Sequence, residues 1–181
     1  MSRTSRHLPF AAEAGFDDPL ETLLGCHRRI EKQLALLKRL ATDMTKHGAS
    51  PEASAAALSL LTYFDRAAVH HHEDEEQDLF PLLESRITDP GEKARFAAFR
   101  DTLRADHRTL EAAWGRLRRP LESIADGRHR QLDQADVQAF VGAYAQHILS
   151  EENALTDFFN RWLKDGDREA LGAAMAARRQ R

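Results

Sequence analysis

Residues 70–81 read His70-His71-His72-Glu73-Asp74-Glu75-Glu76-Gln77-Asp78-Leu79-Phe80-Pro81. Within this stretch, His71 precedes Glu75 by four positions, and His72 precedes Glu76 by the same spacing. Residues four apart on an α-helix project from nearly the same face, about 6 Å apart along the axis. A helical His-x-x-x-Glu pair can therefore direct one imidazole and one carboxylate toward a shared metal ion.

The same spacing recurs three more times along the chain. The further pairs are His27 with Glu31, His107 with Glu111, and His147 with Glu151. With 14 glutamates and 9 histidines in 181 residues, chance predicts about one such pair, whereas five are present. This excess indicates a common site, provided that the helices carrying the pairs face one core.

Composition narrows the class of protein. The chain has 181 residues, 42% hydrophobic and 30% charged, which is typical of one globular domain rich in amphipathic helix. Its net charge of −3 predicts no general affinity for nucleic acid. It contains no apolar run long enough to span a membrane and no signal-peptide core. A single cysteine fits a reducing compartment, so we expect a cytoplasmic location.

Capping signals divide the chain into helices. Asp18-Pro19, Ser50-Pro51 and Asp89-Pro90 each place an N-cap residue before a proline, which is favoured at the first helical position. Asp133 is a fourth N-cap candidate. Together with apolar residues at a 3.6-residue period, these signals predict four long helices. Their expected ranges are 19–47, 51–86, 90–126 and 133–165.

Two prolines and a further cap refine this outline. Pro81 is expected to kink or end the second helix, and Pro120 to bend the third, because proline lacks the backbone donor and clashes with the preceding turn. Asp167 is expected to cap a short fifth helix over residues 168–178.

These elements predict an all-α fold. Strand-like alternation is missing from the sequence, so we expect an antiparallel, up-down-up-down four-helix bundle with a short additional C-terminal helix. Residues 1–16 are expected to form a flexible arm, residues 17–166 the bundle, and residues 167–181 the short helix and a basic tail. The end of that tail, residues 178–181, is expected to fray into solvent.

Counting residues from the connections puts one histidine of each long helix near a common level: His27, His71, His107 and His147. Because neighbouring helices run in opposite directions, Glu75 and Glu151 fall on one side of that level and Glu31 and Glu111 on the other. Buried imidazoles and carboxylates are costly unless they are paired or bind a cation. Several imidazoles with bridging carboxylates suit iron or manganese better than a four-coordinate structural zinc.

The chain resembles the haemerythrin-like (HHE) cation-binding family over about residues 18–165 in an ordered set of motifs: His27, His71-x-x-x-Glu75-Glu76-x-x-Leu79-Phe80-Pro81, His107 and His147-x-x-x-Glu151-Glu152. This resemblance implies a non-haem di-iron centre, oxo- or hydroxo-bridged, inside a four-helix bundle. It also implies that His27 and His71 bind one iron, that His107 and His147 bind the other, and that Glu75 and Glu151 bridge them. Manganese and zinc are the alternative metals.

Some neighbours of these motifs have open roles. Glu111 could be a ligand, a hydrogen-bond acceptor for His107 or a surface charge, and Glu31 is expected to hold an imidazole in place rather than bind iron. His70 and His72 are not expected to bind the metal, since successive residues diverge by about 100° around a helix. The candidate metal ligands are therefore His27, His71, Glu75, His107, Glu111, His147 and Glu151.

Two motifs depart from those of the oxygen-carrying haemerythrins. Those proteins have His-x-x-x-His in the third helix, where this chain has His107-x-x-x-Glu111, and an aspartate one position beyond Glu151 in the fourth. An added carboxylate would raise the negative charge on the metals. We therefore expect oxidation or peroxide turnover to be favoured over reversible release of O2.

Three classes of function follow from this interpretation. The first is a module that binds or senses O2, nitric oxide or peroxide, or handles iron, with such a small molecule as its partner. The second is an enzyme, either a peroxidase-like or oxidase-like di-iron protein or one that repairs iron–sulfur clusters. The third is a metal-free or zinc-stabilised helical interaction protein. Either a monomer or a homodimer is compatible with the sequence, and we expect no membrane or nucleic-acid partner.

Overall fold

The computed structural model describes residues 16–128 and 131–180, and most of these residues are helical. The elements are α1 (Pro19–His47), α2 (Pro51–Thr62), η1 (Tyr63–Ala67), α3 (Ala68–Glu73), η2 (Asp74–Leu79), α4 (Phe80–Arg86), α5 (Pro90–Ala125), α6 (Gln134–Trp162) and α7 (Asp165–Arg178). The described residues contain no strand. The all-α prediction is confirmed.

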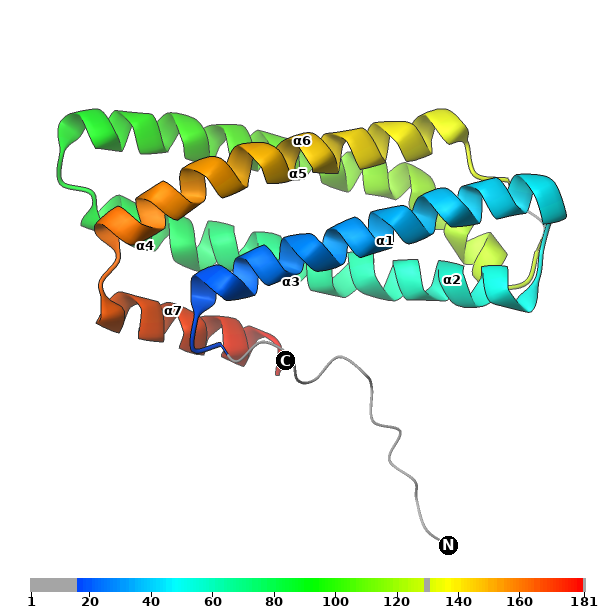
Figure 1. Ribbon diagram of the computed structural model, residues 1–181, viewed down its shortest axis with the longest axis horizontal. Helices are drawn as coiled ribbons and strands as arrows, with labels where there is room; N and C mark the ends of the chain where they lie inside the picture. Colours follow the sequence, from blue (N-terminus) through cyan, green and yellow to red (C-terminus); the bar gives the residue numbers. More distant parts are fainter. Residues whose placement is uncertain (1–15, 129–130, 181) are drawn as a thin grey trace, which may run out of the picture.

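Four helical rods lie lengthwise beside one another (Figure 1). They are α1, the continuous segment from α2 to α4, α5 and α6. α1 packs against both α2 and α6, and α5 also packs against both of them, so the four rods enclose a common interior. α7 packs outside this interior, on α1 and η2. The arrangement is consistent with a haemerythrin-like bundle with an additional C-terminal helix.

The long helices begin where the capping signals predict. In each one, the capping side chain accepts a backbone N–H from the first turn at 2.7–3.1 Å; the acceptors are Asp18, Ser50, Asp89 and Asp133. Gly48 and Gly127 follow the ends of α1 and α5 with φ angles of 76° and 77°. A side chain would be strained in that left-handed region, so glycine permits both chain reversals.

The second rod contains two wide turns that the sequence analysis did not predict. In η1 the N–H of Ala68 donates to the carbonyl of Tyr63, and in η2 the N–H of Phe80 donates to the carbonyl of Glu75. Both bonds span five residues, as in a π-helix, rather than four. Each wide turn inserts one residue and rotates the helix that follows it.

The wide turn η2 ends at Leu79, just ahead of Phe80 and Pro81, close to the place where a kink or helix end was expected. Proline has no N–H to offer the carbonyl four residues back, so a wider turn accommodates it without ending the helix. No proline accompanies η1, and we find no local signal for it in the sequence.

The core consists of two apolar clusters separated by a polar layer. Along α1, Leu23 belongs to one cluster and Ile30 to the other, with His27 between them. Along α6, Ile148 and Leu155 likewise flank Glu151. The predicted metal ligands of the four rods thus cross the bundle at an intermediate level, with apolar packing on both sides.

The start of α7 differs from the prediction that Asp167 caps it. The helix begins at Asp165 with Lys164 as its N-cap, and Asp167 lies in the first turn. There the Asp167 carboxylate accepts the backbone N–H of Lys164 at 3.2 Å and a guanidinium N–H of Arg86 at 2.6 Å. The sequence rule missed this arrangement because the capping partner of Asp167 precedes it and its second partner lies on α4.

The predicted fraying of the basic tail is wrong for Arg178 and Arg179. Arg178 donates to the carboxylates of Asp74, at 2.9 Å, and Asp78, and Arg179 donates to Asp74 at 2.6 Å. Acidic partners on η2, the buried Asp74 and the half-buried Asp78, hold these side chains, and sequence patterns along α7 alone do not reveal them. Arg181 and residues 1–15, most of the predicted flexible arm, lie outside the described residues.

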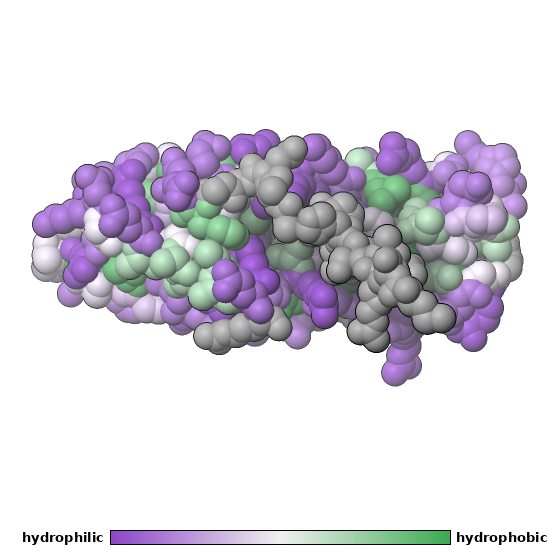
Figure 2. All heavy atoms as spheres, turned by 90° about the horizontal axis from the view of Figure 1, so that it is seen from below, coloured by the Kyte–Doolittle hydropathy of each residue, from purple (hydrophilic) through white to green (hydrophobic). Residues whose placement is uncertain are grey.

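Charged and polar side chains dominate the visible part of the face shown in Figure 2, with small apolar areas between them. Among the described residues, no helix is both long enough and apolar enough to cross a membrane.

Candidate metal centre

The structure brings together the four histidines that residue counting placed at one level. The ring centroids of His27 and His71 lie 4.8 Å apart, and those of His107 and His147 lie 4.9 Å apart. All four side chains are buried. The predicted common level is therefore confirmed.

Glu75 connects the two pairs of imidazoles. Its Oε1 lies 3.4 Å from Nε2 of His71, and its Oε2 lies 3.2 Å from Nε2 of His107. The carboxylate therefore directs one oxygen at each pair.

Glu151 faces the same two pairs from α6. Its Oε1 lies 3.3 Å from Nε2 of His27, and its Oε2 lies 3.1 Å from Nε2 of His147. Ligand atoms of His27, His71, Glu75 and Glu151 all lie within 4.8 Å of one another. Two adjacent positions thus exist, each bordered by two imidazoles and by one oxygen from each carboxylate.

These donor atoms fit a bound cation. Both carboxylates are 0% exposed, and none of their four oxygens has a hydrogen-bond partner among the described residues. The Nε2 atoms of all four histidines also lack one. Buried polar groups without partners are rare because desolvating them is costly, and buried negative charge is costlier still. A divalent cation would satisfy these atoms and offset the charge of the carboxylates.

The outer nitrogens of two imidazoles are held by carboxylates of other helices. Nδ1 of His27 lies 3.0 Å from Glu152, and Nδ1 of His107 lies 2.6 Å from Glu76. An Nδ1–H that donates to a carboxylate leaves Nε2 with a free lone pair pointing at the metal position. The expected holding role of Glu31 is wrong for His27, since Glu152 takes that place.

The surroundings of His71 and Glu151 favour the protonation states that metal binding needs. Burial lowers the pKa of His71 well below its ordinary value, and neighbouring His27 adds to this effect. Burial raises the pKa of the Glu151 carboxyl, but the imidazoles of His147 and His27 close to its oxygens outweigh this and hold the pKa well below its usual range. Neutral imidazoles and ionised carboxylates are the forms that bind metals.

The pKa of Glu75 is shifted in the opposite direction from that of Glu151. Burial, with the negative charge of Glu151 nearby, raises the pKa of its carboxyl well above the ordinary value. The metal-free centre therefore resists a second buried charge. A cation between the two carboxylates would remove this penalty and bring that pKa down.

Two glutamates with the predicted spacing stay outside the centre. The side chains of Glu31 and Glu111 are exposed, and neither belongs to the groups of converging ligand atoms. The acceptor for His107 is Glu76, so the alternative role considered for Glu111 is also filled by another residue. The geometry therefore gives no support to an added Glu111 charge at the metals.

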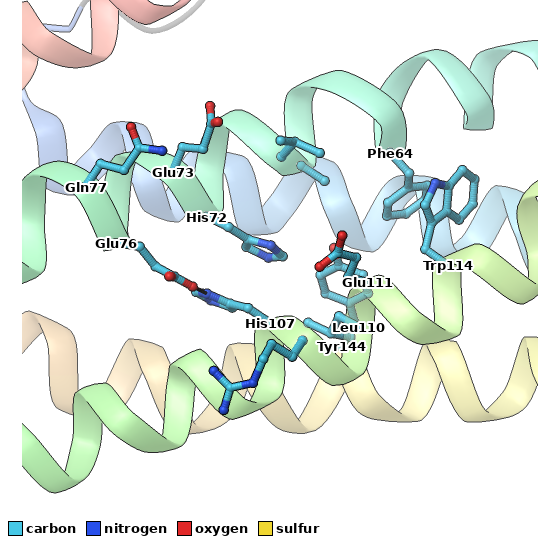
Figure 3. Close-up of a pocket in the computed structure, with 13 residues that line it drawn as sticks. Phe64, His72, Glu73, Glu76, Gln77, His107, Leu110, Glu111, Trp114 and Tyr144 are labelled. Atoms are coloured by element: carbon cyan, nitrogen blue, oxygen red, sulfur yellow. Dashed lines mark hydrogen bonds and ion pairs between the residues drawn. The ribbon is translucent and has the colours of Figure 1, made fainter.

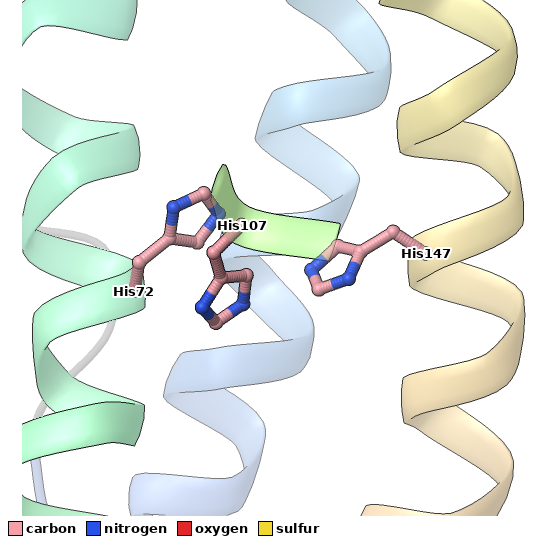
Figure 4. A group of neighbouring side chains, drawn as sticks. All are labelled: His72, His107 and His147. Atoms are coloured by element: carbon pink, nitrogen blue, oxygen red, sulfur yellow. The ribbon is translucent and has the colours of Figure 1, made fainter. Parts of the chain in front are cut away.

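His72 was not among the predicted ligands. One of its ligand atoms lies within 4.8 Å of those of His107 and His147. Three imidazoles from α3, α5 and α6 therefore converge (Figure 4). The rule that successive residues diverge by about 100° is correct, but both directions reach the interior here. The available signal was the second His-x-x-x-Glu pair, formed by His72 and Glu76.

A pocket of about 340 Å³ opens between the α3–η2 segment and α5 (Figure 3). Its inner part includes His72, His107 and Tyr144, whereas Gln77 and Glu111 are among its exposed lining residues. None of His27, His71, Glu75 and Glu151 lines it. The pocket therefore reaches the centre from the side of the second imidazole pair.

A four-rod bundle with a buried layer of histidines and carboxylates is the class of protein that this geometry defines. The sequence matches the family described as the hemerythrin HHE cation binding domain over residues 18–159. The chain belongs to this family, which implies that it binds a metal cation.

A similar protein is known from Haemophilus influenzae. The two sequences are 30% identical over 167 residues, which cover 92% of this chain and 93% of the relative. That relative is described as uncharacterized.

Proposed function

We propose that this chain binds a di-iron centre and uses it to bind or sense O2, nitric oxide or peroxide, or to handle iron. The observation that carries the proposal is the pair of carboxylates, Glu75 and Glu151, each with one oxygen toward each imidazole pair. The proposal includes an antiparallel, up-down-up-down order of the four rods, for which the short connections between them are the support.

Each residue of the centre has a role in this proposal. His27 and His71 would hold one iron, His107 and His147 would hold the other, and Glu75 and Glu151 would bridge them. Imidazole and carboxylate donors suit iron, with manganese and zinc as alternatives. Bound iron would supply one-electron redox chemistry and an affinity for diatomic ligands. Glu152 and Glu76 would keep the rings of His27 and His107 in the orientation for binding.

The pocket supports a small ligand as the partner. Its walls include Ala68, Leu110 and Trp114, which are apolar, and it reaches His107. Charged side chains such as Arg108 and Glu111 also line it. The small size of the pocket and its apolar walls favour uncharged diatomic molecules and peroxide over large substrates. Reaction with peroxide is the second candidate, because the same route would bring it to the His107 side of the centre.

The first experiment is to measure the metal content of the purified protein, followed by its optical spectrum before and after air is admitted to the ferrous protein. The proposal expects two irons per chain and a ligand-to-metal charge-transfer band after oxidation. Adding nitric oxide or peroxide then separates binding, which changes the band stoichiometrically, from turnover, which consumes peroxide repeatedly. A chain that takes up neither iron nor another divalent metal would overturn the proposal and leave a helical interaction protein.

A further inference from the structure

We propose that His72 is a further metal ligand, specific to the position beside His107 and His147. This inference rests on the proposed dinuclear centre and adds a third imidazole to only one of its two positions. The two metal positions then differ in their number of donor atoms and in whether the pocket reaches them.

The placement of His72 supports this role. Its ring is perpendicular to that of His147, with centroids 5.8 Å apart, and its ligand atom belongs to the converging group with His107 and His147 (Figure 4). Its Nε2 is buried and has no hydrogen-bond partner among the described residues. A buried imidazole nitrogen without a partner beside two candidate ligands is a donor available to the same cation.

To bind the same metal as His107, the ring of His72 has to change its orientation. It stacks on His107 with 4.0 Å between centroids and an interplanar angle of 11°. Because imidazole lone pairs lie in the ring plane, two parallel rings can reach one metal only if one of them tilts. Glu76 fixes His107 through a 2.6 Å contact, whereas no hydrogen bond restrains His72 within the part of the chain that the structure describes. His72 is therefore the ring that tilts.

The third imidazole makes the two metal positions different. The His27–His71 position has two nitrogen and two oxygen donors, and all four of its residues are outside the pocket lining. The other position has the same kinds of donors plus His72, and His72 and His107 line the pocket. A small ligand entering there meets His72 beside the metal.

Cobalt titration tests this assignment, because the visible absorption of Co2+ reports its coordination number and the titration reports two affinities. The wild type is compared with His72→Ala, with His72→Phe, which keeps a ring to stack on His107 but has no nitrogen donor, and with His70→Ala as the matched control. We expect both His72 variants to bind the first Co2+ as the wild type does and the second at least about tenfold more weakly. Added imidazole should restore the second event in His72→Ala, and His70→Ala should titrate like the wild type.

The outcomes separate this inference from the proposed function. If the wild type binds two Co2+ and both His72 variants match its affinities and spectrum, His72 is not a ligand and the dinuclear centre still stands. If His72→Phe alone matches the wild type, the ring acts by stacking, and the inference is also overturned. If the wild type binds no metal, the proposed function fails. Circular dichroism of the metal-free variants checks that each one folds.

Discussion

Nε of Arg178 lies 2.9 Å from Oδ1 of Asp74, the residue before Glu75. Asp74 is 1% exposed, and Arg179 donates to its other oxygen at 2.6 Å. Asp74 opens the wide turn η2, so the end of α7 fixes the backbone that presents a predicted bridging carboxylate. The C-terminal helix thus supports the centre without contributing a ligand to it.

Replacing both Arg178 and Arg179 by alanine should therefore destabilise the protein and loosen the centre. The buried Asp74 carboxylate would lose both cationic partners, which should lower the free energy of unfolding by about 2–4 kcal/mol. Urea unfolding measures this change, and metal titration should show weaker binding. Arg39→Ala is the control, because Arg39 is exposed and makes no ion pair with described residues. Equal losses in the two proteins would contradict the supporting role of α7.

Glu75→Gln should abolish binding of the full metal complement while leaving the metal-free protein folded. The pKa of Glu75 is raised by burial, so an uncharged amide resembles the side chain in the metal-free state. We expect at most one metal per chain and an unchanged or higher thermal midpoint without metal. Metal analysis and thermal unfolding check both parts. Two tightly bound metals in this variant would rule out Glu75 as a bridge.

Glu111→Gln tests the one predicted ligand that the structure leaves outside the centre. Its exposed side chain lies at the pocket and not among the converging donor atoms. The variant should keep the metal content and affinities of the wild type, whereas Glu151→Gln should lose metal. A drop in stoichiometry for Glu111→Gln would instead bring Glu111 into the ligand set of the loaded protein.

Acid should destabilise the metal-free protein. Burial lowers the folded-state pKa of His71, His72 and His107 below the ordinary value of 6.5. The stability that they contribute is therefore present above about pH 6.5 and is lost as the pH falls toward their folded pKa values. Glu75 and His27, whose pKa values are raised, oppose this change.

Between pH 7 and pH 5.5, the stability lost through the three imidazoles exceeds the stability gained through Glu75 and His27. We expect the free energy of unfolding to fall by on the order of 1 kcal/mol between pH 7 and pH 5.5. Urea unfolding of the metal-free protein at the two pH values measures it. Greater stability at pH 5.5 would mean that the imidazoles are not held neutral by burial.

Gly172→Ala should disturb the docking of α7. A Cβ at this position would overlap the backbone oxygen of Phe16. The helix or the Phe16 segment would have to shift, so we expect a loss of about 1–3 kcal/mol. Gly166→Ala is the matched control within α7, because its Cβ would meet nothing within 4 Å and alanine favours helix. Thermal unfolding should separate the two, and equal midpoints would contradict the close packing.

Much of the fold follows from local signals in the sequence. Capping residues such as Asp18 and Asp89 act within one turn of a helix, and apolar periodicity acts along a single helix, so both can be read without knowing the neighbours. The common level of the four histidines is also determined by the sequence, because helix lengths and short connections fix it. The correct prediction of that level follows from simple counting along the chain.

Only the tertiary structure decided the details of the site. The inward position of His72 and the contact between Glu76 and His107 depend on how separate helices pack. The ion pairs of Arg178 with η2 likewise join residues about a hundred positions apart. The four-residue spacing between His107 and Glu111 puts both residues on one helical face. The rotation of that helix in the bundle determines which of them is buried. The sequence therefore specified the helices and the candidate donors, and packing selected the donors that converge.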